Sequence, residues 1–515
     1  MATKPVTKPV IQKKLLFYCV WLALLFLTLF TCFPEECQAR AVLSGLFSDH
    51  MVLQRNAPIR VFGQADPKEI VGVGIGENKA VAFANEKGHW IATLKPMPAG
   101  GPHELTVVSG DQKTVIRDVL IGEVWLCSGQ SNMVLSNKNS HLEEEIAATK
   151  FDSRMRFLKL PPRVSARKEY EVNANWKIFD NDTAPGCSAV ATAFALKVQR
   201  EIDMPVGVVV AAVGGSPIQP WLSRDGLNSY PDGRGLIKKI DTIEKGLKAK
   251  NFPTRNLVLN ARESMKKKIE EDPARQLFLS PTTLYNTMIN PLVPYSFKGV
   301  LWYQGEANVY ESDDYSFFLT TLIRDWRARF DEPEMPFFFV QLAPYGAKQA
   351  VPVTASPVAE LRFAQSRAVV VPYTYMAVTL DCCHVKDPDW HACDRAMIGR
   401  RLADIALATQ YNKPYPYKSP SLFTHERQDN KVILHFRNTM KSLKAAGDRP
   451  EGFAIAGRDN KLFWANAELK GDSVEVWCDK IKKPLKVYYA WADNPRGNLL
   501  GQGDLPVVPF ELEVE

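Results

Sequence analysis

The chain is long enough for several domains and has the composition of a folded protein. Its 515 residues are 46% hydrophobic and 23% charged, which suggests about two to four domains with buried cores. The net charge of +7 is modest, and the sequence contains no basic run interleaved with aromatic residues. These features argue against nucleic acid as a partner.

The first residues have the pattern of an export segment. Lys13 and Lys14 precede an apolar run at 15–33, and Ala39 and Ala41 offer small residues at the cleavage positions. We therefore expect a signal peptide over 1–41 and an exported protein, in a periplasmic, extracellular or lumenal location. The apolar run nearly spans a bilayer, so a retained membrane anchor is the alternative.

Two segments have the pattern of small β modules. Residues 42–118 contain short alternating strands separated by Gly and Pro turns, which predicts an N-terminal β sandwich of the immunoglobulin type. Residues 416–515 contain strand-like runs such as 485–491 and predict a second β-sandwich-like module. Neither segment contains an evident catalytic cluster.

The central segment, 119–415, has the pattern of an α/β domain. Longer amphipathic segments alternate with apolar runs at 206–213, 299–303, 337–342 and 375–380. Runs that are buried on both faces indicate a parallel sheet with helices on each side, and hence three layers. The lysine-rich stretch 236–275 predicts exposed helices inserted into this domain.

The first candidate catalytic residue is Ser131. It follows an apolar strand (Val124-Trp125-Leu126) in the run Cys-Ser-Gly-Gln-Ser-Asn-Met at 127–133. Loops at the carboxyl ends of parallel strands hold active sites, and a serine there can act as a nucleophile beside an imidazole. The run is not a Gly-x-Ser-x-Gly elbow, because Met133 replaces the second glycine. The alternative is that Ser131 only caps the next helix.

Two further loops follow apolar runs. The backbone amides of Gly214-Gly215-Ser216 could approach a ligand closely and act as donors in an oxyanion hole. A plain strand-to-helix turn is the alternative. The side-chain amide of Gln304 could be a second donor to the oxyanion. Glu306, in the same loop, is expected to hold neighbouring loops by accepting their N–H groups.

The fourth loop supplies the candidate general base. His391 lies close to acidic residues and just ahead of an amphipathic helix, as a base beside its orienting carboxylate does. His384, earlier in the loop, is the alternative base. Cysteines also gather here, but they form no Cys-x-x-Cys pair, so we predict no metal site.

Together these motifs resemble the sialate O-acetylesterase family of the SGNH-hydrolase superfamily. The segments that carry the resemblance are 122–133, 214–216, 302–308, the His391 loop with 399–403, 46–54, 285–289 and 489–491. The resemblance implies a flavodoxin-like, three-layer α/β domain between two β modules. It also implies a serine carboxylic-ester hydrolase that acts on O-acetylated carbohydrates of the 9-O-acetyl sialic acid type, without a cofactor.

Carried over to this sequence, the resemblance implies particular roles for its loop residues. Ser131 is the nucleophile, His391 is the base, and the oxyanion hole consists of the Ser131 amide, Gly215 or Gly214, and Gln304. Asn132 and Glu306 are possible supporting residues.

The orienting carboxylate is left open. Its usual place, three residues before the base, is occupied by Pro388, so Asp389, Asp387 and Asp381 are candidates and a Ser-His dyad is the alternative. Ala392 and Arg395 replace the proline and the lysine that the family usually has after the histidine.

Other aspects of function stay open at this stage. The substrate could instead be another acetylated polysaccharide, of xylan, pectic or algal type, and a non-catalytic carbohydrate-binding relative is the more distant alternative. Trp221 and Trp302 could stack on a sugar ring, but core packing between strand and helix is the favoured interpretation for both. The sequence does not indicate an oligomeric state.

Overall fold

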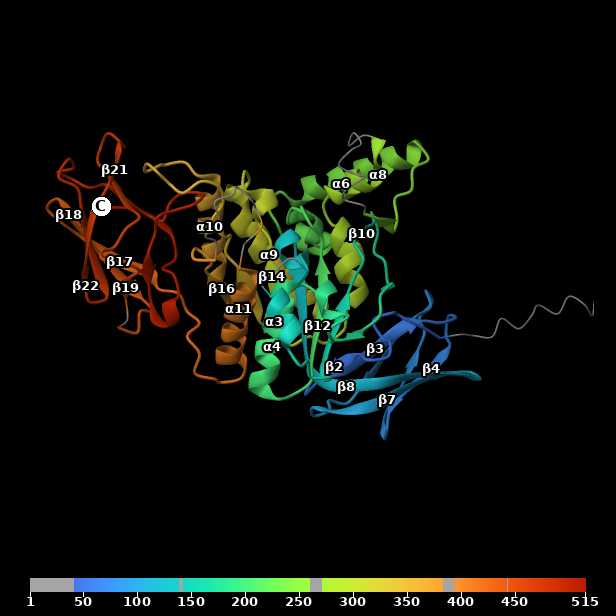
Figure 1. Cartoon of the computed structure of the whole chain (residues 1–515). Coiled ribbons are helices and arrows are strands. Elements are labelled where there is room, and N and C mark those ends of the chain that lie inside the picture. Colours follow the sequence, from blue (N-terminus) through green and yellow to red (C-terminus); the bar gives the residue numbers. More distant parts are fainter. Residues whose placement is uncertain (1–40, 139–141, 260–270, 383–390, 392–393, 442) are drawn as a thin grey trace, which may run out of the picture.

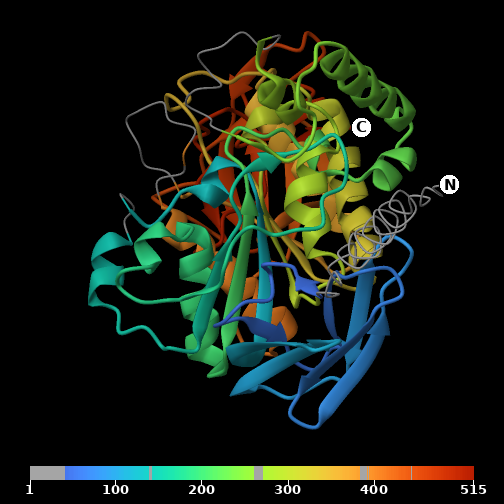
Figure 2. The same cartoon turned by 90° about the vertical axis from the view of Figure 1, so that its right-hand side faces the viewer.

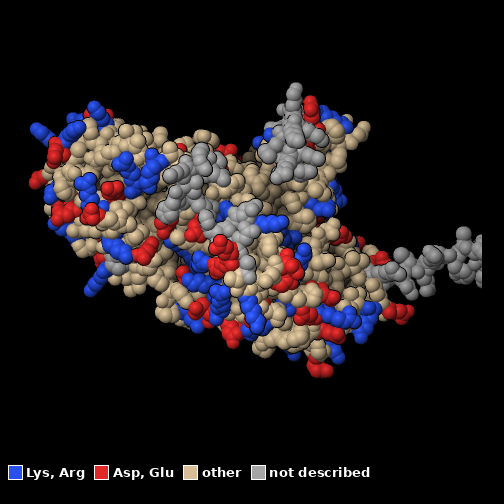
Figure 3. Space-filling model, viewed as in Figure 1, with Lys and Arg blue, Asp and Glu red and all other residues tan. Residues whose placement is uncertain are grey.

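The structure is a computed structural model that describes residues 41–138, 142–259, 271–382, 391, 394–441 and 443–515 (Figure 1). The predicted signal or anchor segment lies outside the described residues, apart from Ala41. No helix within the described ranges is long and apolar enough to cross a membrane. Basic and acidic side chains are interspersed over the face shown in Figure 3.

The central domain is built on a mainly parallel sheet. Its strands span Met155–Lys159 (β9), Lys177–Ile178 (β11), Val206–Ala212 (β12), Gln112–Gly129 (β8), Gly299–Tyr303 (β14), Phe337–Val340 (β15) and Thr374–Ala377 (β16). They lie in the order β11-β9-β12-β8-β14-β15-β16, and every neighbouring pair is parallel except β11 with β9. Strands β12, β14 and β15 are buried throughout, which explains their continuous apolar sequence.

Helices cover both faces of this sheet (Figure 2). The main ones are α4 (Ala189–Ile202), α9 (Ser312–Phe330), α10 (Pro357–Arg367) and α11 (Arg395–Gln410). Trp125 of β8 packs against Phe194 of α4, and α4 contacts α11. Trp302 of β14 pairs in register with Ser128, so its ring points to the opposite face, where it packs against Trp326 of α9. The prediction of an α/β domain with a parallel sheet is confirmed.

The chain reverses its direction of travel across the sheet at β8. From β8 it adds β9, β11 and then β12 on one side, with β12 next to β8, and afterwards β14, β15 and β16 on the other side. Such a reversal leaves a crevice at the carboxyl ends of the strands on either side of it, where open α/β sheets bind ligands. The loops after β8, β12 and β14 meet at this crevice.

Strand β8 also belongs to the N-terminal module. The strands of this module are β1 (Val42–Leu43), β2 (Val52–Gln54), β3 (Ile59–Gln64), β4 (Ile70–Ile75), β5 (Asn78–Phe83), β6 (His89–Leu94) and β7 (Gly100–Ser109). The first half of β8 pairs with β7 and β2, and one hydrophobic core continues from this module into the central domain. The predicted boundary at 118/119 therefore falls inside a single strand.

The C-terminal module has its own core and two four-stranded sheets. One contains β17 (Ser421–Gln428), β18 (Lys431–Arg437), β23 (Ser473–Trp477) and β22 (Asn466–Lys470). The other contains β21 (Leu462–Trp464), β20 (Phe453–Ala456), β24 (Lys486–Tyr489) and β26 (Phe510–Glu513). Two short strands, β19 (Lys444–Ala445) and β25 (Leu499–Leu500), pair with each other.

A buried arginine fastens this module to the central domain. The guanidinium of Arg362 on α10 is fully buried and donates to the carbonyl oxygens of Leu342 and Ala343 at 2.7 and 2.8 Å. It also donates to those of Ala492 and Asp493 at 2.7 and 2.9 Å. One side chain thus binds the loop after β15 and a loop of the C-terminal module at the same time.

The lysine-rich segment forms helices that project from the central domain (Figure 1). They are α6 (Gly233–Ala249) and α8 (Pro273–Phe278). Helix α5 (Arg224–Asn228) precedes them, and the strands β10 (Arg163–Val164) and β13 (Leu257–Val258) form a separate pair. Helix α6 buries Ile240 and Leu247, and its buried Glu244 accepts hydrogen bonds from Arg167 and Lys248.

The turn after β8 depends on one glycine. Gly129 has φ +133°, a conformation that side chains rarely adopt. A Cβ at this position would lie 2.0 Å from the carbonyl oxygen of Tyr303 on β14. The neighbouring Gln130 N–H donates to that same oxygen at 2.9 Å. Only glycine therefore allows the loop to lie against the end of β14.

We expect Gly129→Ala to lower the free energy of unfolding by at least about 2 kcal/mol, because the new methyl group meets backbone in a strained conformation. Urea denaturation measures this loss. Gly246→Ala on α6 is the matched control, since a Cβ there meets no atom within 4 Å; it should gain about 0.5 to 1 kcal/mol. Equal effects of the two substitutions would contradict this interpretation of the turn.

Candidate active site

Ser131 is the first residue of the short helix α2 (Ser131–Val134), directly after β8. It is partly exposed, while Asn132 and Met133 behind it are buried. The N-cap position belongs to Gln130, so the alternative in which Ser131 is only a helix cap is wrong. As the first helical residue, its N–H has no acceptor within the helix and is available to a ligand.

The glycine pair after β12 lies beside Ser131. A Cβ at Gly214 would lie 3.6 Å from the Cβ of Ser131. Gly214 and Gly215 are both exposed, and Gly215 has φ +71°. The Val213 N–H donates to the Gly129 carbonyl at 3.0 Å, which ties this loop to the turn before Ser131. The structure thus places exposed backbone next to the candidate nucleophile.

Gln304 joins the three loops at the crevice. Its Nε2 donates to Gln130 Oε1 at 3.2 Å, to the Ser216 carbonyl at 3.1 Å and to Asn308 Oδ1 at 2.8 Å. Its Oε1 accepts from the Tyr315 hydroxyl at 2.8 Å, and the side chain is 0% exposed. We call these residues the Gln304 cluster. In this arrangement the Gln304 amide holds the three loops together. To act as the predicted oxyanion donor, Nε2 has to break one of these hydrogen bonds and donate to the ligand instead.

Gln130 is a site residue that sequence reasoning missed. Its Oε1 accepts from Gln304 and also from the N–H groups of Gly305 and Ala307 at 3.4 and 3.3 Å. Its Nε2 has no hydrogen-bond partner among the described residues. The residue directly precedes Ser131, so this amide offers a donor next to the candidate nucleophile. The sequence signal that could have pointed to Gln130 is its position in the Ser-Gly-Gln-Ser run, directly before Ser131.

Glu306 supports the nucleophile loop from behind. Its Oε1 accepts a hydrogen bond from the Asn132 side chain, and its Oε2 is buried. Burial raises the pKa of Glu306 to about 7, although the Asn132 amide and nearby backbone N–H groups act in the opposite direction. The predicted contact between this carboxylate and a neighbouring loop is present, and it falls on the residue next to Ser131.

The structure describes only part of the loop that contains the candidate base. His391 is partly exposed and lies a few residues before α11. His384, Asp387 and Asp389 lie outside the described residues.

Asp381, the remaining candidate carboxylate, is bound elsewhere. Its two oxygens pair with the two terminal nitrogens of Arg401 on α11 at 2.8 and 2.9 Å. Asp394, which precedes α11, caps that helix by accepting from the Met397 N–H at 2.8 Å. Among the described acidic residues near the base, both are therefore committed to structural contacts.

The two tryptophans considered for sugar stacking belong to the core. Trp221 is 0% exposed and Trp302 is 1% exposed. Their rings meet edge to face, with centroids 5.8 Å apart and planes at 88°. The possibility that they stack on a sugar is wrong, because no face of either ring is open to a ligand.

Potential metal ligands are dispersed in the described part of the chain. Its residues include no group of three or more His, Cys, Asp or Glu side chains that could hold an ion. Cys127, Cys187 and Cys478 are buried and free. Burial raises the pKa of the Cys187 thiol to about 11, so it stays protonated at neutral pH.

Comparison with known proteins identifies the family. A model described as "Carbohydrate esterase, sialic acid-specific acetylesterase" matches residues 121–251 and 263–408, more than half of the chain. The chain belongs to this family. The matched segments contain Ser131, Gly214, Gln304 and His391. The family resemblance predicted from the motifs is confirmed, and the chain is an esterase.

Named relatives cover most of the esterase. The sialate O-acetylesterase of Rattus norvegicus is 29% identical over 511 residues, 88% of this chain and 90% of the rat protein. That of Homo sapiens is 29% identical over 496 residues, 88% of each chain. A carbohydrate acetylesterase from Xanthomonas citri of known crystal structure is 30% identical, with a TM-score of 0.78 over 92% of this chain and 100% of that one.

We expect Glu306→Gln to change how the stability of the esterase depends on pH. The folded-state pKa of Glu306 is raised to about 7, so the protonated carboxyl is favoured in the fold. The stability that the protonated Glu306 contributes to the fold is fully present below about pH 4.5 and is lost as the pH rises through about 7. The melting temperature of the wild type should therefore fall, relative to the variant, between about pH 5 and pH 8. Glu311→Gln, at an exposed position, is the control. If the melting temperatures of the wild type and of Glu306→Gln changed in parallel with pH, the raised pKa of Glu306 would be contradicted.

Gln304→Ala should destabilise the fold, because three buried acceptors lose their common donor. We expect a loss of about 2 to 4 kcal/mol in chemical denaturation. Gln502→Ala, at an exposed position, should change stability by less than about 0.5 kcal/mol. If Gln304→Ala kept full stability and lost only activity, by about 10² to 10³, Gln304 would be an oxyanion donor and not the link between the loops.

Proposed function

We propose that the protein is an exported carbohydrate O-acetylesterase that uses a Ser-His mechanism. The observation that carries the proposal is the position of Ser131, partly exposed at the carboxyl end of β8 with Gly214 beside it, at the point where the sheet order reverses. The family match over this region supports an acetyl ester as the substrate group.

The proposed chemistry assigns each residue one task. Neutral His391 accepts the proton of Ser131, and Ser131 Oγ attacks the acetyl carbonyl carbon. The oxyanion is held by the Ser131 amide and by an amide of Gly214 or Gly215. His391 then protonates the departing sugar oxygen, and water releases acetate from the acetylated serine by the same route.

The third oxyanion donor comes from a side-chain amide. Gln304 Nε2 can donate to the oxyanion if the oxyanion replaces one of its three protein acceptors. Gln130 Nε2 can donate to it without breaking a hydrogen bond within the protein. The carboxylate that orients His391 is proposed to be Asp389 or Asp387, since Asp381 is paired with Arg401. A Ser-His dyad is the alternative.

The central domain is proposed to have the SGNH-hydrolase, flavodoxin-like fold between two β-sandwich modules. The five neighbouring strands β12, β8, β14, β15 and β16 have the order 2-1-3-4-5 once the additional strands β9 and β11 are set aside, which supports this assignment. The pairing of strands into two sheets at each end of the chain supports the flanking sandwiches.

The proposed substrates are O-acetylated sugars, with O-acetyl sialic acids first. The rat and human relatives are named sialate O-acetylesterases, while the relative from Xanthomonas citri is named a carbohydrate acetylesterase. Acetylated plant or algal polysaccharides are therefore the second candidates. Export through the segment 1–41 brings the enzyme to extracellular glycans, and membrane attachment would occur only through that segment.

Acetate release from an aryl acetate and from an O-acetylated sialic acid tests the mechanism. We expect Ser131→Ala and His391→Ala each to lose activity by about 10³ or more, with similar losses, because a nucleophile and its base act as a unit. Ser473→Ala and His425→Ala, both in the C-terminal module, are the matched controls and should retain activity. An active His391→Ala variant would place the base elsewhere, with His384 as the first candidate.

A further inference from the structure

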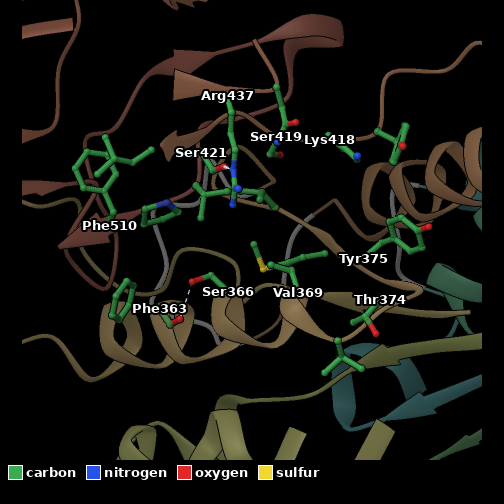
Figure 4. A pocket seen from close by; sticks show the side chains of 18 of the residues that line it. Phe363, Ser366, Val369, Thr374, Tyr375, Lys418, Ser419, Ser421, Arg437 and Phe510 are labelled. Carbon is green, nitrogen blue, oxygen red and sulfur yellow. Dashed lines mark hydrogen bonds between the residues drawn. The ribbon is translucent and has the colours of Figure 1, made fainter. Parts of the chain in front are cut away.

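A cavity lies between the central domain and the C-terminal module, apart from Ser131. It has a volume of about 580 Å³ and lies between α10 and β16 of the central domain and β17, β18 and β26 of the C-terminal module (Figure 4). Ser131, Gly214, Gln304 and His391 are not among the residues that line it. A cavity of several hundred Å³ between two domains has the size of a small-ligand or oligosaccharide site.

Aromatic side chains from both domains line this cavity. Phe363 and Tyr375 come from the central domain, Tyr417 from the segment that links the domains, and Phe510 from the C-terminal module. The rings of Tyr375 and Tyr417 lie 6.1 Å apart, and both residues are only partly buried. Tyrosine combines an apolar ring with a hydrogen-bonding hydroxyl, which suits the apolar face and the hydroxyl groups of a sugar.

A cation projects into the same space. Figure 4 shows Arg437 extending from β18 into the gap above α10, with Phe363 and Phe510 on one side and Tyr375 on the other. Its Nε donates to Ser421 Oγ at 3.0 Å, which fixes the base of the guanidinium. The terminal nitrogens of Arg437 have no acceptor among the described residues.

The charges around the cavity favour an anion. Lys418 lies over the Tyr417 ring at 5.4 Å and, like Arg437, has no ion pair within the described residues. Glu511, an acidic residue of the lining, already accepts a hydrogen bond from the Tyr488 hydroxyl at 2.8 Å. The lining thus contains two cations and one carboxylate, and neither cation forms an ion pair with Glu511. The fork of an arginine matches the two oxygens of a carboxylate.

We propose that this cavity binds a carboxylate-bearing sugar of a glycan, with Arg437 on the carboxylate and the aromatic rings against the pyranose. Sialic and uronic acid units share this chemistry. Strand β16 forms part of the cavity wall and continues toward the His391 loop. The cavity thus holds an acidic glycan against the edge strand of the catalytic domain. It is a binding site separate from the site at which the ester is hydrolysed.

The direct test is calorimetric titration of the whole protein with sialyllactose and with a galacturonate trimer. Lactose and xylotriose are the neutral counterparts. We expect at least one acidic probe to bind about tenfold or more tightly than its neutral counterpart, and the tighter of the two identifies the unit. Because these probes carry no acetyl ester, the result does not depend on the proposed esterase mechanism.

Variants of the cavity locate the binding. Arg437→Ala and Arg437→Gln should each weaken binding of the acidic probe by about tenfold or more, and Lys418→Ala should weaken its binding less. Arg458→Ala, at an exposed position of the same module that does not line the cavity, should bind like the wild type. Unchanged hydrolysis of an aryl acetate by Arg437→Ala and Arg437→Gln shows that the fold is intact. Equal binding of acidic and neutral probes, unchanged binding by both Arg437 variants, or no binding at millimolar concentration would overturn the proposal.

Discussion

The structure around the candidate nucleophile depends on the buried amide of Gln304. A buried amide must find partners inside the protein, and Gln304 finds them in Gln130, Ser216 and Asn308. These partners follow three different strands, so one side chain sets the distances between three loops. The position of Ser131 relative to the glycine pair follows from this arrangement.

All three parts of the chain contribute to holding that arrangement. Strand β8 passes from the N-terminal module through the centre of the parallel sheet and ends two residues before Ser131. Gln365 on α10 donates to the Gln304 carbonyl at 3.1 Å, and Arg362 on the same helix holds the C-terminal module. The flanking modules are thus connected to the site through packed and hydrogen-bonded elements, and the cavity at Arg437 exists because of the same contact between domains.

The sequence predicts the parts of the site that local pattern determines. Ser131 and Gly214 are predictable because each follows an apolar run, and parallel strands bring such loops to one edge. The surroundings of Gln304, the free amide of Gln130 and the pairing of Asp381 with Arg401 could not be predicted, because they depend on groups brought together from distant segments. The same is true of the cavity around Arg437.

The most direct test of the central claim, that Ser131 is the nucleophile, is covalent labelling with a serine-reactive organophosphonate, followed by peptide mass mapping. A phosphonate bonds to the activated hydroxyl and remains there, since its adduct resists the hydrolysis that releases acetate. The account predicts one adduct, on the peptide that contains Ser131, with loss of activity in proportion to labelling. An adduct on Ser128 or Ser216, or labelling of Ser131 without loss of activity, would contradict it.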